Sequence, residues 1–415
     1  MHDQRPEPSL TRATVLVLAL TAPLALVLVA VTCDPWLPNV GILVGGMDVH
    51  VYRDGAFRIL HDIPLYTEPT FRGLQYTYTP FSTLVFTFFY LIPWAWVNTV
   101  WLWINLSILA LCVLMCWRIL GYRPTPKLVT ASVLLATTCI FLEPVRTTLF
   151  FGQINLLLML LVLWDFSRKD QSLLRGMGVG IAAGIKLVPL YYIVQYLALR
   201  QWRSAATACA VFLATVLASW ILLPADSREY WTSTFFESSR IAPDTHPANQ
   251  SLRGALAHLT GNAAPLWLWV LIAGAVTVVS LFVTTRLYEQ GNPLLSITLT
   301  GLTACAISPF SWGHHWVWFI PLLVYLIHRA QSNPRWWLAA LALYLSTSAW
   351  TYTYAPGQVA VGLFLFPPSW PIAPLLLNIY SLIYLITLTA AAMITVRRDR
   401  LHPGCTTPSS FQRLR

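Results

Sequence analysis

Long apolar runs recur along almost the whole chain, and short polar segments separate them. A membrane-spanning helix needs roughly 20 apolar residues. Twelve segments meet or approach this requirement, at 12–31, 97–117, 127–146, 149–166, 175–187, 188–199, 203–223, 265–287, 294–309, 313–328, 336–353 and 374–396. The pattern therefore predicts an all-α, polytopic membrane protein with about 12 transmembrane helices.

Two of these segments, 175–187 and 188–199, are together about long enough for one span. Pro189 interrupts them, and Arg175 and Arg200 bracket them. A bent hairpin that enters the membrane and returns to the same side fits both facts. The first run, 11–31, is long and many spans follow it, so we interpret it as an uncleaved span rather than a signal peptide.

The positive charges give the chain a direction across the membrane. With the N-terminus in the cytosol, 18 of the 26 Lys and Arg residues fall on the cytosolic side and seven fall outside. Basic residues concentrate in cytoplasmic loops, so we predict that both termini are cytosolic. Counting the run 76–93 as a span would invert every later loop. We therefore expect an interfacial or re-entrant helix there, within a long outer loop.

Composition supports a lipid environment and excludes other classes. Only 10% of the residues are charged, against about 25% in an average soluble domain. The net charge of +10 is dispersed over short loops, which excludes a basic patch for nucleic acid. Cys112, Cys116, Cys139, Cys209 and Cys305 lie in apolar runs, so we expect buried thiols and no structural disulfide.

We expect one transmembrane domain over residues 1–400 and a disordered cytosolic tail over 401–415. The outer loops 32–96 and 224–264 are long, and ten of the 16 acidic residues lie on the outer side. Chemistry is therefore expected on that side. Asp48 stands out, because a carboxylate next to the membrane and beside Tyr52 can have a raised pKa suited to a general base. The alternative interpretation is a solvated loop acid.

Further polar residues stand at the predicted outer ends of spans. Tyr76 and Tyr78 precede a Pro-started helix and suit either an interface anchor or sugar contacts. Glu143 and Arg146 can pair with each other or bind a substrate. Gln153 and Asn155 adjoin a Leu-rich run, where buried amides need partners. These residues are candidate substrate ligands.

Lys186 lies in the middle of the predicted hairpin 175–199, whereas the other Lys and Arg residues of the predicted membrane segments lie at or next to a segment end. An intramembrane lysine is costly and indicates a functional site, here an anion contact. The alternative is that its long side chain carries the ammonium group from the bend of the hairpin out to the water interface. In the second outer loop Asn249, Gln250 and Arg253 supply two amides and a cation. His314 and His315 lie between aromatic residues at the outer face.

Adjacent histidines on a helix point about 100° apart, so His314 and His315 favour proton relay or phosphate contact over a shared metal. We predict no metal site and no cofactor. GxxxxGK[ST], GxGxxG and HExxH motifs are absent from the sequence, so nucleotide-driven transport and zincin chemistry are unsupported. A lipid or sugar transporter stays the alternative class. It would place ionisable groups at mid-membrane in repeated halves, and no repeat is visible.

Seven features occur in a characteristic order. They are the first span, the acid Asp48, Tyr76-Thr77-Tyr78-Thr79-Pro80, Gly152-Gln153-Ile154-Asn155, Gly184-Ile185-Lys186-Leu187-Val188-Pro189, Asn249-Gln250-Ser251 and Ser308-Pro309-Phe310-Ser311-Trp312-Gly313-His314-His315-Trp316. In this order the chain resembles glycosyltransferase family 87, a family of the membrane-embedded C superfamily. The histidine segment and the Gln-Ile-Asn segment are the most specific parts of the resemblance, which covers nearly the whole chain.

The resemblance implies an inverting α-(1→2)-mannosyltransferase at the outer face of the plasma membrane. It implies a polyprenyl-phosphate-mannose donor, a mannosylated lipid acceptor and catalysis by Asp48, with His314 or His315 as a possible partner. The stretch after Asn249 is similar to enzymes that make higher phosphatidylinositol mannosides, whereas 63–66 is similar to lipomannan-branching relatives. Because one relative transfers arabinofuranose, the sugar stays open, as does the oligomeric state.

Overall fold

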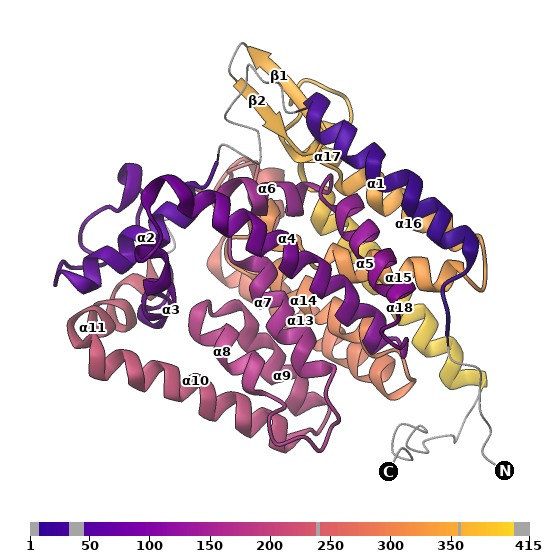
Figure 1. The fold of residues 1–415 in the computed structure, drawn as a ribbon, viewed down its shortest axis with the longest axis horizontal. Helices are drawn as coiled ribbons and strands as arrows, with labels where there is room; N and C mark the ends of the chain where they lie inside the picture. The colour runs from indigo at the N-terminus through magenta and orange to yellow at the C-terminus, as the bar shows by residue number, and fades with distance from the viewer. Residues whose placement is uncertain (1–7, 33–44, 238–240, 356–357, 402–415) are drawn as a thin grey trace.

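The computed structural model describes residues 8–32, 45–237, 241–355 and 358–401, and Figure 1 shows their arrangement. Helices make up nearly all of this part of the chain. Five of them are long and apolar enough to cross a membrane: α1 (Arg12–Thr32), α4 (Trp94–Ile119), α10 (Trp202–Leu222), α13 (Leu266–Glu289) and α18 (Ile379–Leu401). Large apolar side chains on these helices, such as Leu20, Leu217 and Leu271, are exposed. Such surfaces suit lipid, and the protein is a polytopic membrane protein.

The remaining helices are shorter. They are α2 (Met47–Leu60), α3 (Pro80–Tyr90), α5 (Pro126–Cys139), α6 (Glu143–Phe151), α7 (Asn155–Phe166), α8 (Met177–Ile185), α9 (Tyr191–Ala198), α11 (Pro224–Thr232), α12 (Leu252–Thr260), α14 (Pro293–Ile307), α15 (Phe319–Ala330), α16 (Trp336–Thr347) and α17 (Ala373–Leu377). Helix length and composition alone therefore support five spans, or six if the bent pair α6 and α7 is one. Short helices are tolerated at membrane depth where other helices bury their ends.

The sequence placed several segment boundaries wrongly. The run 127–146 does not form one helix, since α5 ends at Cys139 and a new helix, α6, starts at Glu143. The axes of α6 and α7 differ by 117°. The run 336–353 ends as a strand, because β1 (Thr351–Ala355) pairs with β2 (Gln358–Val361) in an antiparallel hairpin. Cys209 was expected to be buried but is exposed on α10.

The expected interfacial helix in the first outer loop is α3, whose 11 residues are too few to span a bilayer. It packs against α2 and α10 at one end of the molecule (Figure 1). The core lies elsewhere, around α14 and α15, where almost every side chain is buried. Gly301 on α14 lets the ring of Trp318 approach the helix backbone, because a side chain there would overlap the indole.

Helices α8 and α9 form the bent hairpin that the sequence indicated. Gly176 just before α8 and two glycines within it lie against α10 in the same order along both helices, with Gly176 at Ser204, Gly180 at Ala208 and Gly184 at Thr215. The two helices therefore run parallel. The chain then breaks at Lys186, passes through a 3₁₀ turn (Val188–Leu190) and returns along α9 to the start of α10. Lys186 is thus held at the tip of the hairpin.

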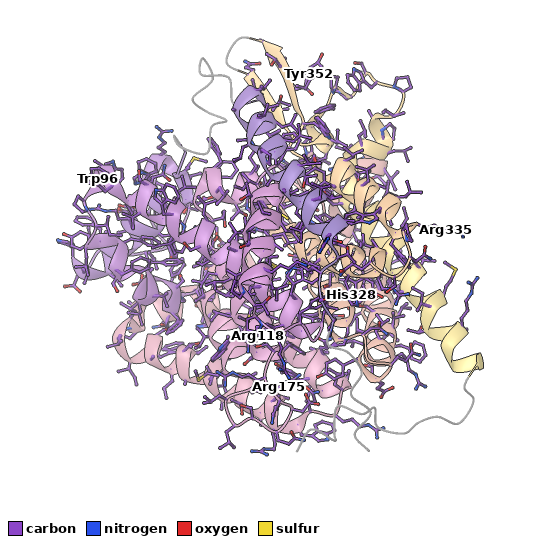
Figure 2. The ribbon with its side chains drawn as sticks, turned by 45° about the vertical axis from the view of Figure 1, so that its right-hand side comes forward. Trp96, Arg118, Arg175, His328, Arg335 and Tyr352 are labelled. Atoms are coloured by element: carbon purple, nitrogen blue, oxygen red, sulfur yellow. The ribbon has the colours of Figure 1, made fainter. Side chains whose placement is uncertain are left out.

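Hydrogen bonds join segments on the predicted cytosolic side to one another. Four of these bonds run from Lys127 Nζ to the Leu10 carbonyl at 2.8 Å, from Gln331 to the Tyr122 hydroxyl at 2.6 Å, from Arg175 to the Tyr288 hydroxyl at 2.9 Å and from Gln290 to the Thr395 carbonyl at 3.3 Å. Figure 2 shows Arg118 and Arg175 toward the lower end of the molecule and Tyr352 at the opposite end. The hydrogen-bonded segments around Arg175 and the hairpin that carries Tyr352 thus lie at opposite ends of the molecule.

Candidate active site

Two adjacent glycines bring the start of α2 against the rest of the helices. Gly46 has φ +94°, a conformation that L side chains rarely adopt, and its N–H donates to the Phe150 carbonyl at 2.5 Å. A side chain at Gly45 would overlap the Phe150 backbone, and one at Gly46 would overlap Asn98. This close approach fixes Asp48, in the first turn of α2, beside the bend between α6 and α7.

Gln153 clamps the Asp48 carboxylate. Its Nε2 donates to Asp48 Oδ2 at 2.6 Å, and its Oε1 accepts from the hydroxyls of Tyr78 at 2.9 Å and Tyr52 at 3.2 Å. Because two phenols face the amide oxygen, the amide nitrogen must face the carboxylate. The Tyr52 and Tyr78 hydroxyls also contact each other at 2.8 Å, and the Tyr52 ring stacks on Phe86 at 4.3 Å.

Burial raises the pKa of Asp48 to about 6, while the hydrogen bond from Gln153 and the charge of Lys186 act in the opposite direction. A carboxylate with this pKa is mostly ionised at neutral pH and still binds a proton readily. It therefore has the property required of a general base. Within the described residues Asp48 is hydrogen-bonded by Gln153, and a catalytic partnership with His314 or His315 stays a prediction.

Lys186 adjoins this clamp from the tip of the α8–α9 hairpin. Its Nζ lies 5.2 Å from the centre of the Tyr78 ring, 3.2 Å from Asn155 Oδ1 and 3.0 Å from His315 Nε2. An ammonium group has only hydrogens to offer, so His315 accepts through Nε2 and is neutral with its proton on Nδ1. His315 therefore orients Lys186. A small cavity of about 40 Å³, large enough for water, lies among Lys186, His315 and Asn155.

Asn155 links the segment that contains His314 and His315 to the start of α7. Its Nδ2 donates to the His314 carbonyl at 2.9 Å, and the Thr148 hydroxyl approaches the same oxygen at 3.4 Å. Asn155 is also the first residue of α7. The N-terminal end of that half-helix, with its partial positive charge, thus lies beside Lys186. The His314 ring is buried, and its Nε2 has no hydrogen-bond partner within the described part of the chain.

Glu143 and Arg146 do not bond to each other in the described contacts. Glu143 accepts from the Tyr380 hydroxyl at 2.6 Å and the Thr147 hydroxyl at 3.0 Å, and a side chain at Gly313 would lie 2.6 Å from its oxygens. Arg146 donates to the Thr32 hydroxyl at 2.7 Å and the Ala349 carbonyl at 3.2 Å. Both residues join segments around the site and do not contact Asp48.

The Asn-Gln-Ser motif likewise joins segments. Asn249 Oδ1 accepts from the Ser311 N–H at 3.2 Å, and Gln250 Nε2 donates to the Leu377 carbonyl at 2.8 Å. Arg253 pairs with Asp244 at 2.9 Å and faces the Trp269 ring. These contacts hold the loop before α12 against the histidine segment, so the predicted substrate ligands of the second loop are occupied by protein groups.

Tyr76 is buried beneath the site, with its hydroxyl 2.6 Å from Ser82 and its ring against Gly55. It fixes α3 to α2. Sequence reasoning missed Tyr380, because nothing near it in the chain indicates that it meets Glu143. It also missed the role of Thr79, whose hydroxyl donates to the Gly184 carbonyl and so links the Tyr-x-Tyr segment to the hairpin. The described residues contain no group of three metal-ligating side chains.

Comparisons with known proteins agree with this architecture. Residues 76–309 match the model of glycosyltransferase family 87. The chain is 34% identical, over 69% of its length and 68% of the relative's, to a polyprenol-phosphate-mannose-dependent α-(1-2)-phosphatidylinositol pentamannoside mannosyltransferase of Mycobacterium tuberculosis. It is 31% identical, over 67% and 69%, to a phosphatidylinositol mannoside mannosyltransferase of the same species. An α-(1→3)-arabinofuranosyltransferase of Corynebacterium glutamicum is 27% identical over 71% of each chain.

Proposed function

The chain belongs to glycosyltransferase family 87, and on that premise we propose that it transfers mannose from polyprenol-phosphate-mannose to a phosphatidylinositol mannoside, forming an α-(1→2) bond. The arrangement of Asp48, Gln153 and Lys186 carries this proposal. It places one oriented carboxylate next to one cation, and these are the two charges that sugar transfer from a lipid phosphate requires.

The carboxylate removes the acceptor's proton. An acceptor hydroxyl hydrogen-bonded to Asp48 attacks the anomeric carbon of the mannosyl donor, and its proton passes to Asp48 as the new C–O bond forms. Base catalysis of this kind contributes about 10²–10⁴-fold to the rate. Gln153 and the two phenols behind it keep the carboxylate oxygen aimed at the hydroxyl. With a β-linked donor, this single displacement gives the α product.

The cation stabilises the leaving group. When the bond between the anomeric carbon and the phosphate oxygen breaks, the electron pair stays on the polyprenyl phosphate. Lys186 is held by Asn155 and His315, and the N-terminal end of α7 adds partial positive charge beside it. Fixed positive groups that meet a developing anion lower the barrier without reorganising. The phosphate is a good leaving group, so a second carboxylate is not required.

We also propose the orientation that places this site outside the cytosol. The chain crosses the plasma membrane with both termini inside, and the α8–α9 hairpin enters from the cytosolic side and points its tip, with Lys186, toward the outer face. The donor and the acceptor are both lipids. A site at the outer end of broken helices lets their reactive headgroups meet while their tails stay in the bilayer.

The test is transfer by the purified full-length chain in lipid vesicles. Radiolabelled polyprenol-phosphate-mannose is offered with phosphatidylinositol mannosides or with lipomannan, and a parallel reaction offers the corresponding arabinofuranose donor. The proposal expects a labelled phosphatidylinositol mannoside whose new sugar an α-mannosidase releases. Transfer of arabinofuranose alone, or movement of lipid across the vesicle without transfer, would overturn it.

A further inference from the structure

A cluster of aromatic and basic residues from α2, the turn Phe71–Gly73 and the start of α4 lies away from the proposed active site. His50, Phe71 and Trp94 pack ring against ring, with His50 centred 4.0 Å from Trp94 and 5.1 Å from Phe71. The Arg53 guanidinium lies over the Trp94 ring at 5.2 Å, and that of Arg72 lies over the Phe71 ring at 5.4 Å. We call these five residues the basic aromatic cluster.

Within the described part of the chain, no acid neutralises the cations of this cluster. Neither Arg53 nor Arg72 forms an ion pair with any described residue, whereas the nearby acids Asp54 and Glu68 both face Arg58. Burial lowers the pKa of the His50 imidazole, and the nearby charges of Arg53 and Arg72 lower it further. Positive groups collected around one ring without a carboxylate form a site for an anion.

Two details indicate that the cluster is built to accept a ligand. His50 Nδ1 is buried and has no hydrogen-bond partner among the described residues. A buried polar atom of this kind costs free energy unless a ligand supplies the missing hydrogen bond. Arg72 has φ +55° in a 3₁₀ turn (Phe71–Gly73), a conformation that non-glycine residues rarely adopt. Residues held in this way concentrate at binding sites.

The surroundings of the cluster identify the anion as part of a lipid. Trp94 of the cluster is exposed, as are Leu91 and Trp96 next to it in the chain, and Figure 2 shows Trp96 at the margin of the molecule. Tryptophan concentrates where lipid headgroups meet the acyl chains. A lipid phosphate lies at that same depth, so its phosphodiester can meet the arginines while the lipid tails pass the exposed side chains.

The position on the helix shows which of the two substrates is bound. His50 is two residues from Asp48, so the two side chains point to nearly opposite sides of α2, across a helix about 10–12 Å wide. The donor's phosphate is bonded to the reacting sugar and must therefore stay on the Asp48 side, near Lys186. An acceptor of several sugars has its phosphate far from its reacting hydroxyl and can reach around the helix.

We propose that His50, Arg53 and Arg72 bind the phosphodiester of the acceptor glycolipid, separately from the donor phosphate at Lys186. This assignment rests on the proposed function for the identity of the acceptor. It assigns the outer side of α2 to acceptor recognition and the inner side to catalysis. The aromatic rings keep the guanidinium groups in place, so little side-chain freedom is lost when the anion binds.

The test compares two variants with a matched control in the full-length chain. Arg53→Gln with Arg72→Asn removes both charges, and asparagine tolerates the backbone of position 72. Arg72→Asn alone changes one exposed side chain, so this single variant is expected to fold normally. Arg228→Gln removes an exposed charge from α11, elsewhere on the predicted outer side.

The proposal expects the KM for the acceptor to rise about tenfold in the double variant, the loss expected for one charge-assisted hydrogen bond, with the KM for the donor unchanged. A rise in the donor KM, an unchanged acceptor KM, or an equal effect of Arg228→Gln would overturn the assignment.

A second measurement does not depend on catalysis. Native mass spectrometry of the purified protein measures how much phosphatidylinositol it retains relative to phosphatidylcholine. The double variant should lose the preference for phosphatidylinositol, and Arg228→Gln should keep it. Retention that the double variant leaves unchanged contradicts the anion site even if mannose transfer is confirmed. A lost preference supports the anion site even if transfer itself is absent.

Discussion

Gln153 shows how a neutral side chain can control a charged one. Its amide oxygen faces two phenols and its amide nitrogen faces Asp48, so the group cannot be turned around without placing an oxygen against a carboxylate. The hydrogen bond stabilises the ionised form of Asp48 against the burial that raises its pKa. Removing the amide should therefore affect acidity as well as geometry.

Asp48→Asn should lower the rate of sugar transfer by about 10²–10⁴-fold, because the amide cannot take the acceptor's proton. Steady-state transfer assays check this, with lipid binding measured to confirm that the variant is intact. Asp62→Asn is the matched control, since Asp62 is exposed in the same outer loop and its φ of +55° suits asparagine. Full activity in Asp48→Asn would contradict the assignment of the base.

The pH dependence should follow the ionisation of Asp48. Because its pKa is about 6 in the folded protein, kcat/KM should fall as the pH drops below about 6 and should level off above it. Gln153→Ala removes a group that lowers this pKa, so the acid limb should move upward by about one pH unit. An unmoved limb would mean that another group controls the profile.

Lys186→Met should raise the KM for the polyprenyl-phosphate donor by at least about tenfold, since a charged hydrogen bond to phosphate is lost. It should change the KM for the acceptor much less. Separate titrations of donor and acceptor measure the difference. An equal loss for both substrates would indicate that Lys186 holds the fold of the site rather than the donor's phosphate.

At the scale of elements, the site forms where helices break. The bend between α6 and α7 presents Gln153 and Asn155, and the break after α8 presents Lys186. The sequence indicated the second break through Pro189 and its flanking arginines. It did not indicate the first, because 127–146 and 149–166 are both apolar enough to read as continuous spans. The apolar content of a segment indicates that it lies in lipid or in the core, but it does not indicate where a helix ends.

The polar residues selected from the sequence fall into two groups, those that meet at the candidate site and those that bond to other parts of the fold. Asp48, Gln153, Asn155 and Lys186 are expensive near a membrane, and they do meet at one place. Glu143, Asn249 and Gln250 are equally polar, yet they are satisfied by groups far away in the chain, such as Tyr380, Ser311 and Leu377. A single sequence does not show such partners, so it cannot separate ligands of the substrate from ties within the fold.

Gly184 offers a test of how α8 positions Lys186. A methyl group there would overlap Thr215 on α10, so Gly184→Ala should push the hairpin away from α10. Overpacking of this kind costs about 1–3 kcal/mol, and we expect a lower thermal midpoint together with reduced transfer. Gly274→Ala on α13 has open space around it and should leave both unchanged. A normal Gly184→Ala enzyme would show that the contact does not control the site.

At the scale of the molecule, the hydrogen-bonded loops around Tyr122, Arg175 and Gln290 lie at one end, and the proposed site lies toward the other. The five long helices join them. The loops that basic residues mark do bond to one another, while the side of the membrane on which they lie stays a prediction. The family predicted from motif order is confirmed by the match over residues 76–309.

The proposed orientation can be measured directly. In a cysteine-free background within intact cells, Asp62→Cys should react with a membrane-impermeant maleimide, whereas Arg335→Cys should react only after permeabilisation. Both positions are exposed, so a failure to label reflects the side of the membrane and not burial. The reverse pattern would place the site in the cytosol and contradict the proposed function.

The α8–α9 hairpin also has a consequence for how the protein is made. With nine residues, α8 is about 14 Å long, too short to settle across a bilayer by itself. The surface that receives it, on α10, is synthesised afterward, and His315 follows the end of α10 by about 90 residues. During translation Asn155 is therefore present before Lys186, whereas His315 is not yet made. A nascent chain released before His315 has inserted would already contain Asp48 and Lys186, but not the neutral imidazole that orients the lysine.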